Sequence, residues 1–176
     1  MLTGRYVLHL ASTDAVRSVV QLLAARQVEV VTLSVAADAD GTATLHLTAT
    51  LPDLASGELL VKRLNRLIDV VKTVEVSAAR FHEREAVLVR VEAEATTRRL
   101  VLDVADAFGA DVVEVKRHSL TLGLFAEPRR VRDFLTVLAD HPISELVGSG
   151  VLPVRRGGAS LRRRPAASVD ASREPA

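Results

Sequence analysis

The sequence contains no cysteine and few aromatic residues. Zero cysteines among 176 residues exclude disulfides, thiolate metal sites and cysteine nucleophiles. Aromatic residues make up 3% of the chain, too few to provide the stacking platforms that single-stranded RNA requires. No apolar run approaches the roughly 20 residues of a membrane span. We therefore expect a protein that binds neither nucleic acid nor a membrane.

Motifs of catalysis and of metal or phosphate binding are also missing. The glycine-containing stretches "VGSG" and "RRGG" lie at or after the last expected strand, whereas a phosphate loop joins a strand to a helix. The histidines do not show the spacing of metal ligands on a helix. His9 and His46 belong to neighbouring expected strands and could approach each other, but we interpret them as part of a polar sheet face. We expect no catalytic site and no metal site.

The overall composition is that of a soluble globular protein, with 48% hydrophobic and 26% charged residues. The N-terminus shows no apolar segment typical of a signal peptide, so we expect a cytoplasmic location. The formal net charge of +1 conceals a basic end, because residues 155–176 carry six arginines. Residues 158–176 lack hydrophobic periodicity, which predicts a disordered basic tail.

The hydrophobic pattern of residues 1–77 predicts the order strand, helix, strand, strand, helix, strand. The helix faces repeat every three to four residues, and the strands alternate between apolar and polar residues. The expected elements are a strand at 5–11, a helix at 14–26, strands at 29–37 and 42–51, a helix after the N-cap Asp53, and a strand at 69–76.

The same order recurs after a polar joint at 77–85. The expected elements are a strand around 87–91, a helix through 101–108, strands at 111–115 and 119–125, a helix through 131–138, and a closing strand at 143–148. Two consecutive βαββαβ units predict an α+β fold of two ferredoxin-like sandwiches, with domains at 1–77 and 78–157. Each sheet would carry two helices on one face and leave the other uncovered.

Several segments resemble the small regulatory subunit of acetolactate (acetohydroxyacid) synthase. They are "KRLNRLIDVVKTVEV" at 62–76, "REAVLVRVEA" at 84–93, "DVADAFGADVVEVKRHSLTLGL" at 103–124 and "ISELVGSGVLPVRRG" at 143–157. The resemblance covers about residues 5–157. It implies an N-terminal ACT domain, a C-terminal domain of related topology, and a homodimer in which the ACT sheets pair edge to edge. The valine-rich strand at 29–36 is the edge we expect to pair.

The resemblance further implies a non-catalytic regulatory subunit. Such a subunit binds and activates the catalytic subunit of acetolactate synthase in branched-chain amino-acid biosynthesis. The chain itself would hold no cofactor, and thiamine diphosphate, magnesium and FAD would belong to the catalytic partner. The alternative is a free-standing ACT-type small-molecule sensor, or a diverged paralogue that regulates a different enzyme.

In the family, valine is held between ACT domains by the first strand-to-helix turn of one and the region after the first helix of the other. The residues carried over to this chain are Ala11, Ser12, Asp14, Ala15, Val16, Glu29 and Val30.

The turn departs from the family pattern Glu-Asn-Lys-Pro-Gly-Val-Leu. Ala11 stands at the asparagine, Thr13 at the proline and Asp14 at the glycine, whereas a shift of one residue puts Ser12 at the asparagine. Gln27 and Glu29 replace a later glycine and asparagine. We expect Asp14, Ser12 or Thr13 to cap the helix and valine inhibition to be weak or absent, although the two acids could instead select a cationic effector.

Overall fold

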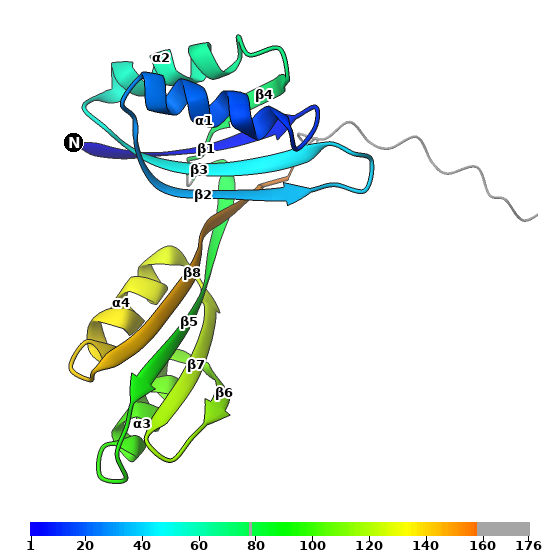
Figure 1. Ribbon diagram of the computed structural model, residues 1–176. Helices are drawn as coiled ribbons and strands as arrows, with labels where there is room; N and C mark the ends of the chain where they lie inside the picture. Colours follow the sequence, from blue (N-terminus) through cyan, green and yellow to red (C-terminus); the bar gives the residue numbers. More distant parts are fainter. Residues whose placement is uncertain (78, 158–176) are drawn as a thin grey trace, which may run out of the picture.

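The computed structural model describes residues 1–77 and 79–157. This part of the chain forms two four-stranded antiparallel sheets, each with two helices on one face (Figure 1). The predicted fold class, two consecutive βαββαβ sandwiches, is confirmed. The tail predicted at 158–176 lies outside the described residues.

The N-terminal sandwich has the strand order β2-β3-β1-β4. Its elements are β1 (Leu2–Leu10), α1 (Ala15–Ala25), β2 (Glu29–Ala37), β3 (Ala43–Leu51), α2 (Leu54–Leu64) and β4 (Val70–Glu75). The C-terminal sandwich has the order β6-β7-β5-β8. Its elements are β5 (Phe81–Glu92), α3 (Arg98–Phe108), β6 (Asp111–Val115), β7 (Ser119–Ala126), α4 (Pro128–Leu138) and β8 (Ile143–Arg155).

The N-terminal core lies between the sheet and its helices. Alternate residues of β1 face the helices, and Tyr6, Leu8 and Leu10 are buried there. The ring of Tyr6 reaches α2 at Gly57, where a Cβ would stand 2.9 Å from the Tyr6 hydroxyl oxygen. A glycine inside a helix normally costs stability, but here it provides the space that the tyrosine hydroxyl occupies.

The C-terminal core is closed by contact between its two helices. The rings of Phe108 on α3 and Phe134 on α4 lie 5.4 Å apart between centroids. Arg130 on α4 stacks over Phe108 and donates hydrogen bonds to the carbonyl oxygens of Ala107 and Phe108 at 3.2 and 3.3 Å. These contacts fix α3 against α4.

Two strands of the C-terminal sheet are longer than the sequence pattern predicts. The polar joint at 77–85 is wrong in part, because β5 already begins at Phe81. The closing strand does not stop at residue 148, because β8 continues to Arg155. The extensions pair with each other, with Glu83 opposite Pro153 and Phe81 opposite Arg155. We call this paired extension, residues 81–85 and 151–155, the stem.

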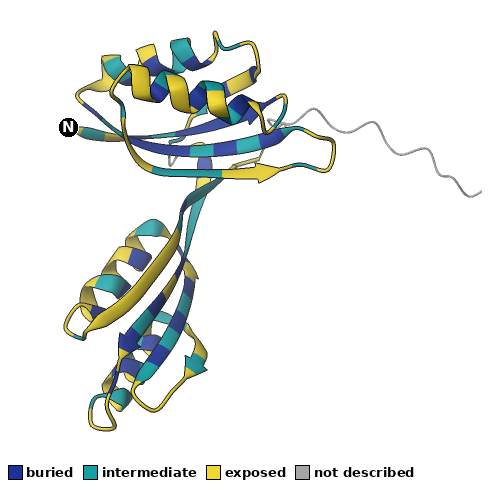
Figure 2. Cartoon of the chain, viewed as in Figure 1, coloured by how far each residue is buried: buried dark blue, intermediate teal, exposed yellow. Residues whose placement is uncertain are grey.

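The pairing of β5 with β8 is irregular next to the stem, between Glu85 and Val87. The stem and this bulge lie against the N-terminal sheet on the face opposite the helices (Figure 1). The expectation that this face is uncovered is therefore wrong for the N-terminal sheet. Val7, His9 and Thr48 alternate with core residues and so point away from the helices, yet all three are buried. Figure 2 shows how much of β1 and β3 is buried. Arg5 forms an ion pair with Glu83 of β5 at 3.0 Å, which ties the sheet to the stem.

Candidate functional site

The predicted effector turn forms the corner between β1 and α1. Its backbone is anchored at Ala11, whose N–H donates a 2.9 Å hydrogen bond to the carbonyl oxygen of Asp69. Ala11 and Asp14 are exposed, Ser12 is half-buried, and Ala15 is buried in the core. Val16 packs partly against the same core. The corner therefore offers a small polar surface above an apolar base.

The expectation that Asp14 caps α1 with its side chain is wrong. Within the described residues Asp14 makes no side-chain cap hydrogen bond, because its backbone is already helical at φ −63° and ψ −26°. The first N–H groups of the helix donate to backbone carbonyl oxygens instead. These bonds run from Ala15 to Ser12 at 3.3 Å, from Val16 to Thr13 at 3.1 Å, and from Arg17 to Asp14 at 3.2 Å.

Asp53 at the start of α2 shows the conformation that capping needs. Its backbone is extended, at φ −155° and ψ 175°, and its Oδ1 accepts a 2.7 Å hydrogen bond from the N–H of Ser56. The side chain of Ser56 and, next to it in effect, this backbone N–H lower the pKa of the Asp53 carboxyl by hydrogen bonding to it. The predicted cap at Asp53 is confirmed.

The second part of the predicted site follows α1. Gln27 ends the helix in the left-handed conformation, with φ 52°, where the resemblance places a glycine. Its N–H donates to the carbonyl oxygen of Ala24 at 3.0 Å, which is typical of a left-handed helix end. Glu29 and Val30 then begin β2, and both are exposed.

The chain does not bring the two parts of the predicted site together. The corner follows Leu10, whose partner on β3 is Ala43. Glu29 pairs with Thr50, which is opposite Thr3 at the other end of β1. Seven residues of β1 separate these ends, or roughly 23 Å at the rise of a strand. A ligand that contacts both parts therefore requires a second copy of the chain.

β2 is an edge strand whose outer side is open. It pairs only with β3 within the described residues, and Val30, Val31 and Val35 are exposed on it. The pairing with β3 is irregular between Val30 and Thr32. An open edge with exposed valines is a surface for pairing with another strand.

The two histidines singled out in the sequence, His9 and His46, lie on the neighbouring strands β1 and β3. Within the described residues no group of three metal-ligating side chains is present. Both histidines lie on the sheet face that the stem covers, whereas we expected that polar face to be uncovered. The Nδ1 atoms of both are buried without a hydrogen-bond partner in the described chain, and burial lowers the pKa of His46.

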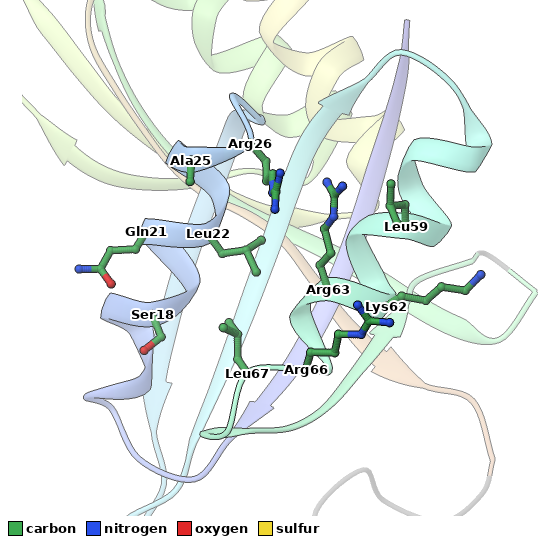
Figure 3. A pocket seen from close by; sticks show the side chains of 10 residues that line it. All are labelled: Ser18, Gln21, Leu22, Ala25, Arg26, Leu59, Lys62, Arg63, Arg66 and Leu67. Atoms are coloured by element: carbon green, nitrogen blue, oxygen red, sulfur yellow. The ribbon is translucent and has the colours of Figure 1, made fainter.

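The sequence patterns did not indicate a groove between α1 and α2, of about 740 Å³ (Figure 3). The helices run in opposite directions, and the side chains of Leu22 and Leu67 point into the gap between them. Its remaining lining residues are Ser18, Gln21, Ala25, Arg26, Leu59, Lys62, Arg63 and Arg66. The cations are scattered in the sequence around helix ends, where they look like ordinary dipole partners.

Comparisons with known proteins agree with this architecture. A family model described as "Small subunit of acetolactate synthase" matches residues 84–157. The acetolactate synthase small subunit of Haemophilus influenzae is 32% identical over 146 residues, which cover 82% of this chain and 90% of that protein. The chain belongs to the acetolactate synthase small-subunit family. The predicted resemblance is thereby confirmed.

Other members of the acetolactate synthase small-subunit family match over shorter segments. The small subunit of Mycolicibacterium smegmatis is 39% identical over 100 residues, and this match spans 57% of the chain and only 59% of that relative. The crystal structure of the Thermotoga maritima small subunit has the same fold, with a TM-score of 0.79 at 18% identity over 90% of this chain and 100% of that one. Among the described residues, we find no helix that could span a membrane.

Proposed function

We propose that this chain is a non-catalytic regulatory subunit that binds and activates the catalytic subunit of an acetolactate synthase in branched-chain amino-acid biosynthesis. The observation that carries the proposal is the match to the H. influenzae small subunit, which extends over both sandwiches. Thiamine diphosphate, magnesium and FAD would belong to the catalytic subunit, and this chain would contribute contacts only.

The structure offers a physical route for regulation. β5 and β8 run without interruption from the covered face of the N-terminal sheet into the C-terminal sheet (Figure 1). The Arg5–Glu83 ion pair and the close approach of Gly150 to Thr32 join the stem region to the sheet. A change in the N-terminal sheet would therefore be transmitted along continuous strands rather than through a flexible linker.

The active form in this proposal is a homodimer joined through β2. Antiparallel pairing of two β2 strands would satisfy the open edge and cover exposed valines such as Val31 and Val35. It would also place the start of one β2 beside the end of the other. Glu29 of one copy would then approach the corner at residues 11–16 of the second copy.

We propose that the effector site completed in this way does not hold valine. The three N–H groups at the start of α1 already donate to carbonyl oxygens within the corner, so they are not free for a ligand carboxylate. Asp14 and Glu29 would add two negative charges where an amino acid presents its own carboxylate. A cationic effector is the alternative that these acids favour.

Co-expression with the acetolactate synthase catalytic subunit of the same genome tests the function. With an affinity tag on the catalytic subunit, we expect this chain to be retained through purification. If it is not retained, and pull-down from the native host instead recovers another enzyme or no enzyme, the chain regulates a different enzyme or acts as a free-standing sensor.

A further inference from the structure

The groove between α1 and α2 is a cluster of cations that nothing in the N-terminal sandwich neutralises. Within the described residues Arg26, Lys62, Arg63 and Arg66 form no salt bridge, and the groove is lined by no carboxylate. In Figure 3 Arg26, Arg63 and Arg66 lie along the groove, with Arg26 near one end and Arg66 toward the other, and the side chain of Lys62 extends away from α1. Helix dipoles favour cations at helix ends, but they do not account for a shared cationic groove.

The corresponding gap in the C-terminal sandwich is filled. There Phe108 and Phe134 bring the two helices together, and Arg130 bonds across the gap to α3. In the N-terminal sandwich the small side chains of Ser18 and Ala25 stand along the gap instead, and the leucines at its base remain accessible. The same fold thus leaves one of its two helix layers open.

The residues around the groove are better suited to binding a protein surface than to binding a small anion. Ile68, which follows the groove residue Leu67, is 99% exposed, and Leu59 on the groove wall is 45% exposed. Apolar side chains framed by charges are characteristic of an interface that excludes water at its centre. A small polyanion would use the guanidinium groups and leave the leucines unused.

Two other surfaces of the N-terminal sandwich already have an assigned neighbour. The sheet face opposite the helices carries the stem, and the open edge at β2 is the surface we assign to the second copy. Resting on the proposed function, we infer that the α1–α2 groove is the docking site for an acidic surface of the catalytic subunit. Carboxylates of the partner pair with the four cations, and its apolar side chains contact Leu22, Leu59 and Ile68.

Charge reversal in the groove tests this inference in the full-length chain. We expect Arg63→Glu with Arg66→Glu to weaken binding of the purified catalytic subunit at least tenfold, and the double alanine variant to weaken it less. The matched control is Arg129→Glu with Arg132→Glu on α4, which has the same spacing and the same charge change. Arg129, Arg132 and Arg66 are exposed, and Arg63 is half-buried. This control should change the affinity less than threefold. The wild-type affinity should fall as salt is added.

The outcomes separate this inference from the proposed function. If wild-type chain does not bind the catalytic subunit, the proposed function fails. If it binds and the groove variants, with unchanged thermal unfolding, bind equally well, the docking site is elsewhere and the inference fails. Calorimetry with tripolyphosphate tests whether the groove binds a small anion instead. Saturable binding of this probe that the groove variants lose, together with unchanged binding of the catalytic subunit, would make the groove a small-anion site and overturn the inference.

Discussion

Gly150 of β8 lies directly against Thr32 of β2. A Cβ at position 150 would stand 2.9 Å from the Oγ1 of Thr32 and 3.0 Å from its Cβ, and the backbone there is left-handed, at φ 67°. The glycine also lies in the irregular part of β8, where the pairing register changes opposite Glu85 and Val87. Glycine at position 150 therefore avoids a clash with Thr32 and adopts a left-handed backbone without strain, at the contact between the two sandwiches.

Replacement of Gly150 by alanine should therefore destabilise the protein. We expect Gly150→Ala to lower the free energy of unfolding by about 1–3 kcal/mol, because the new Cβ meets Thr32 and the φ value disfavours any side chain. Urea denaturation measures this change. Gly148→Ala is the matched control, since its Cβ would meet only the carbonyl oxygen of Ala86, at 3.8 Å. Equal effects of the two substitutions would show that the contact with Thr32 is unimportant.

The same region shows what the sequence could not predict. The alternating apolar residues of β3 and the periodic faces of α1 and α4 predicted those elements to within a few residues. The extension of β8 was missed because Gly148, Gly150 and Pro153 look like strand breakers. Proline is tolerated in β8 because β8 is an edge strand, where a missing N–H need not interrupt the ladder.

The candidate site was predictable only in part. The cap at Asp53 follows from residue type and position, but Asp14 fails as a cap because the backbone of the corner is set by the β1–α1 connection. The covered face of the N-terminal sheet and the α1–α2 groove depend on contacts between residues far apart in the chain. No local pattern contains that information.

Replacement of glutamine by glycine should change the free energy of unfolding in opposite directions at Gln27 and at Gln21. The left-handed backbone of Gln27 strains a side chain, so Gln27→Gly should raise the free energy of unfolding by about 0.5–1 kcal/mol. The same change at Gln21, inside α1, should lower it by about 1 kcal/mol. Thermal and urea unfolding of the two variants measure both effects. Destabilisation by Gln27→Gly would mean that the glutamine side chain makes a contribution that the helix-end geometry does not explain.

Tyr6 is the only tyrosine of the chain, so its ionisation can be followed directly. Burial, with a smaller effect of the charge on Glu75, raises the pKa of Tyr6 to about 12. The folded state therefore holds the proton more tightly than the unfolded state, whose tyrosine titrates near its ordinary pKa of about 10. The stability linked to this proton is complete below that value and is lost as the pH rises toward 12.

Absorbance titration of the phenolate in folded protein and in urea measures the two pKa values. Tyr6→Phe should remove the part of the alkaline destabilisation that this proton causes. A folded-state tyrosine that titrates at its ordinary pKa would contradict the buried position of the ring between β1 and Gly57.

Valine should have little effect on the reconstituted enzyme. We expect no saturable heat of valine binding in the micromolar range and no matching inhibition, because the corner N–H groups are occupied and Asp14 and Glu29 are acidic. The same measurements are made with lysine, leucine and isoleucine. A double variant, Asp14→Gly with Glu29→Asn, restores the family residues at these two positions. Micromolar valine binding with inhibition by the unmodified chain would refute the assignment.

The regulatory role is tested most directly by titrating this chain into a fixed amount of the catalytic subunit of the same genome while acetolactate formation is measured. The catalytic subunit carries its thiamine diphosphate, magnesium and FAD throughout, and an equal amount of an unrelated protein is the control. We predict that the rate rises severalfold and saturates as the complex fills. An unchanged rate over the full titration, with folded chain and active catalytic subunit, would contradict the account.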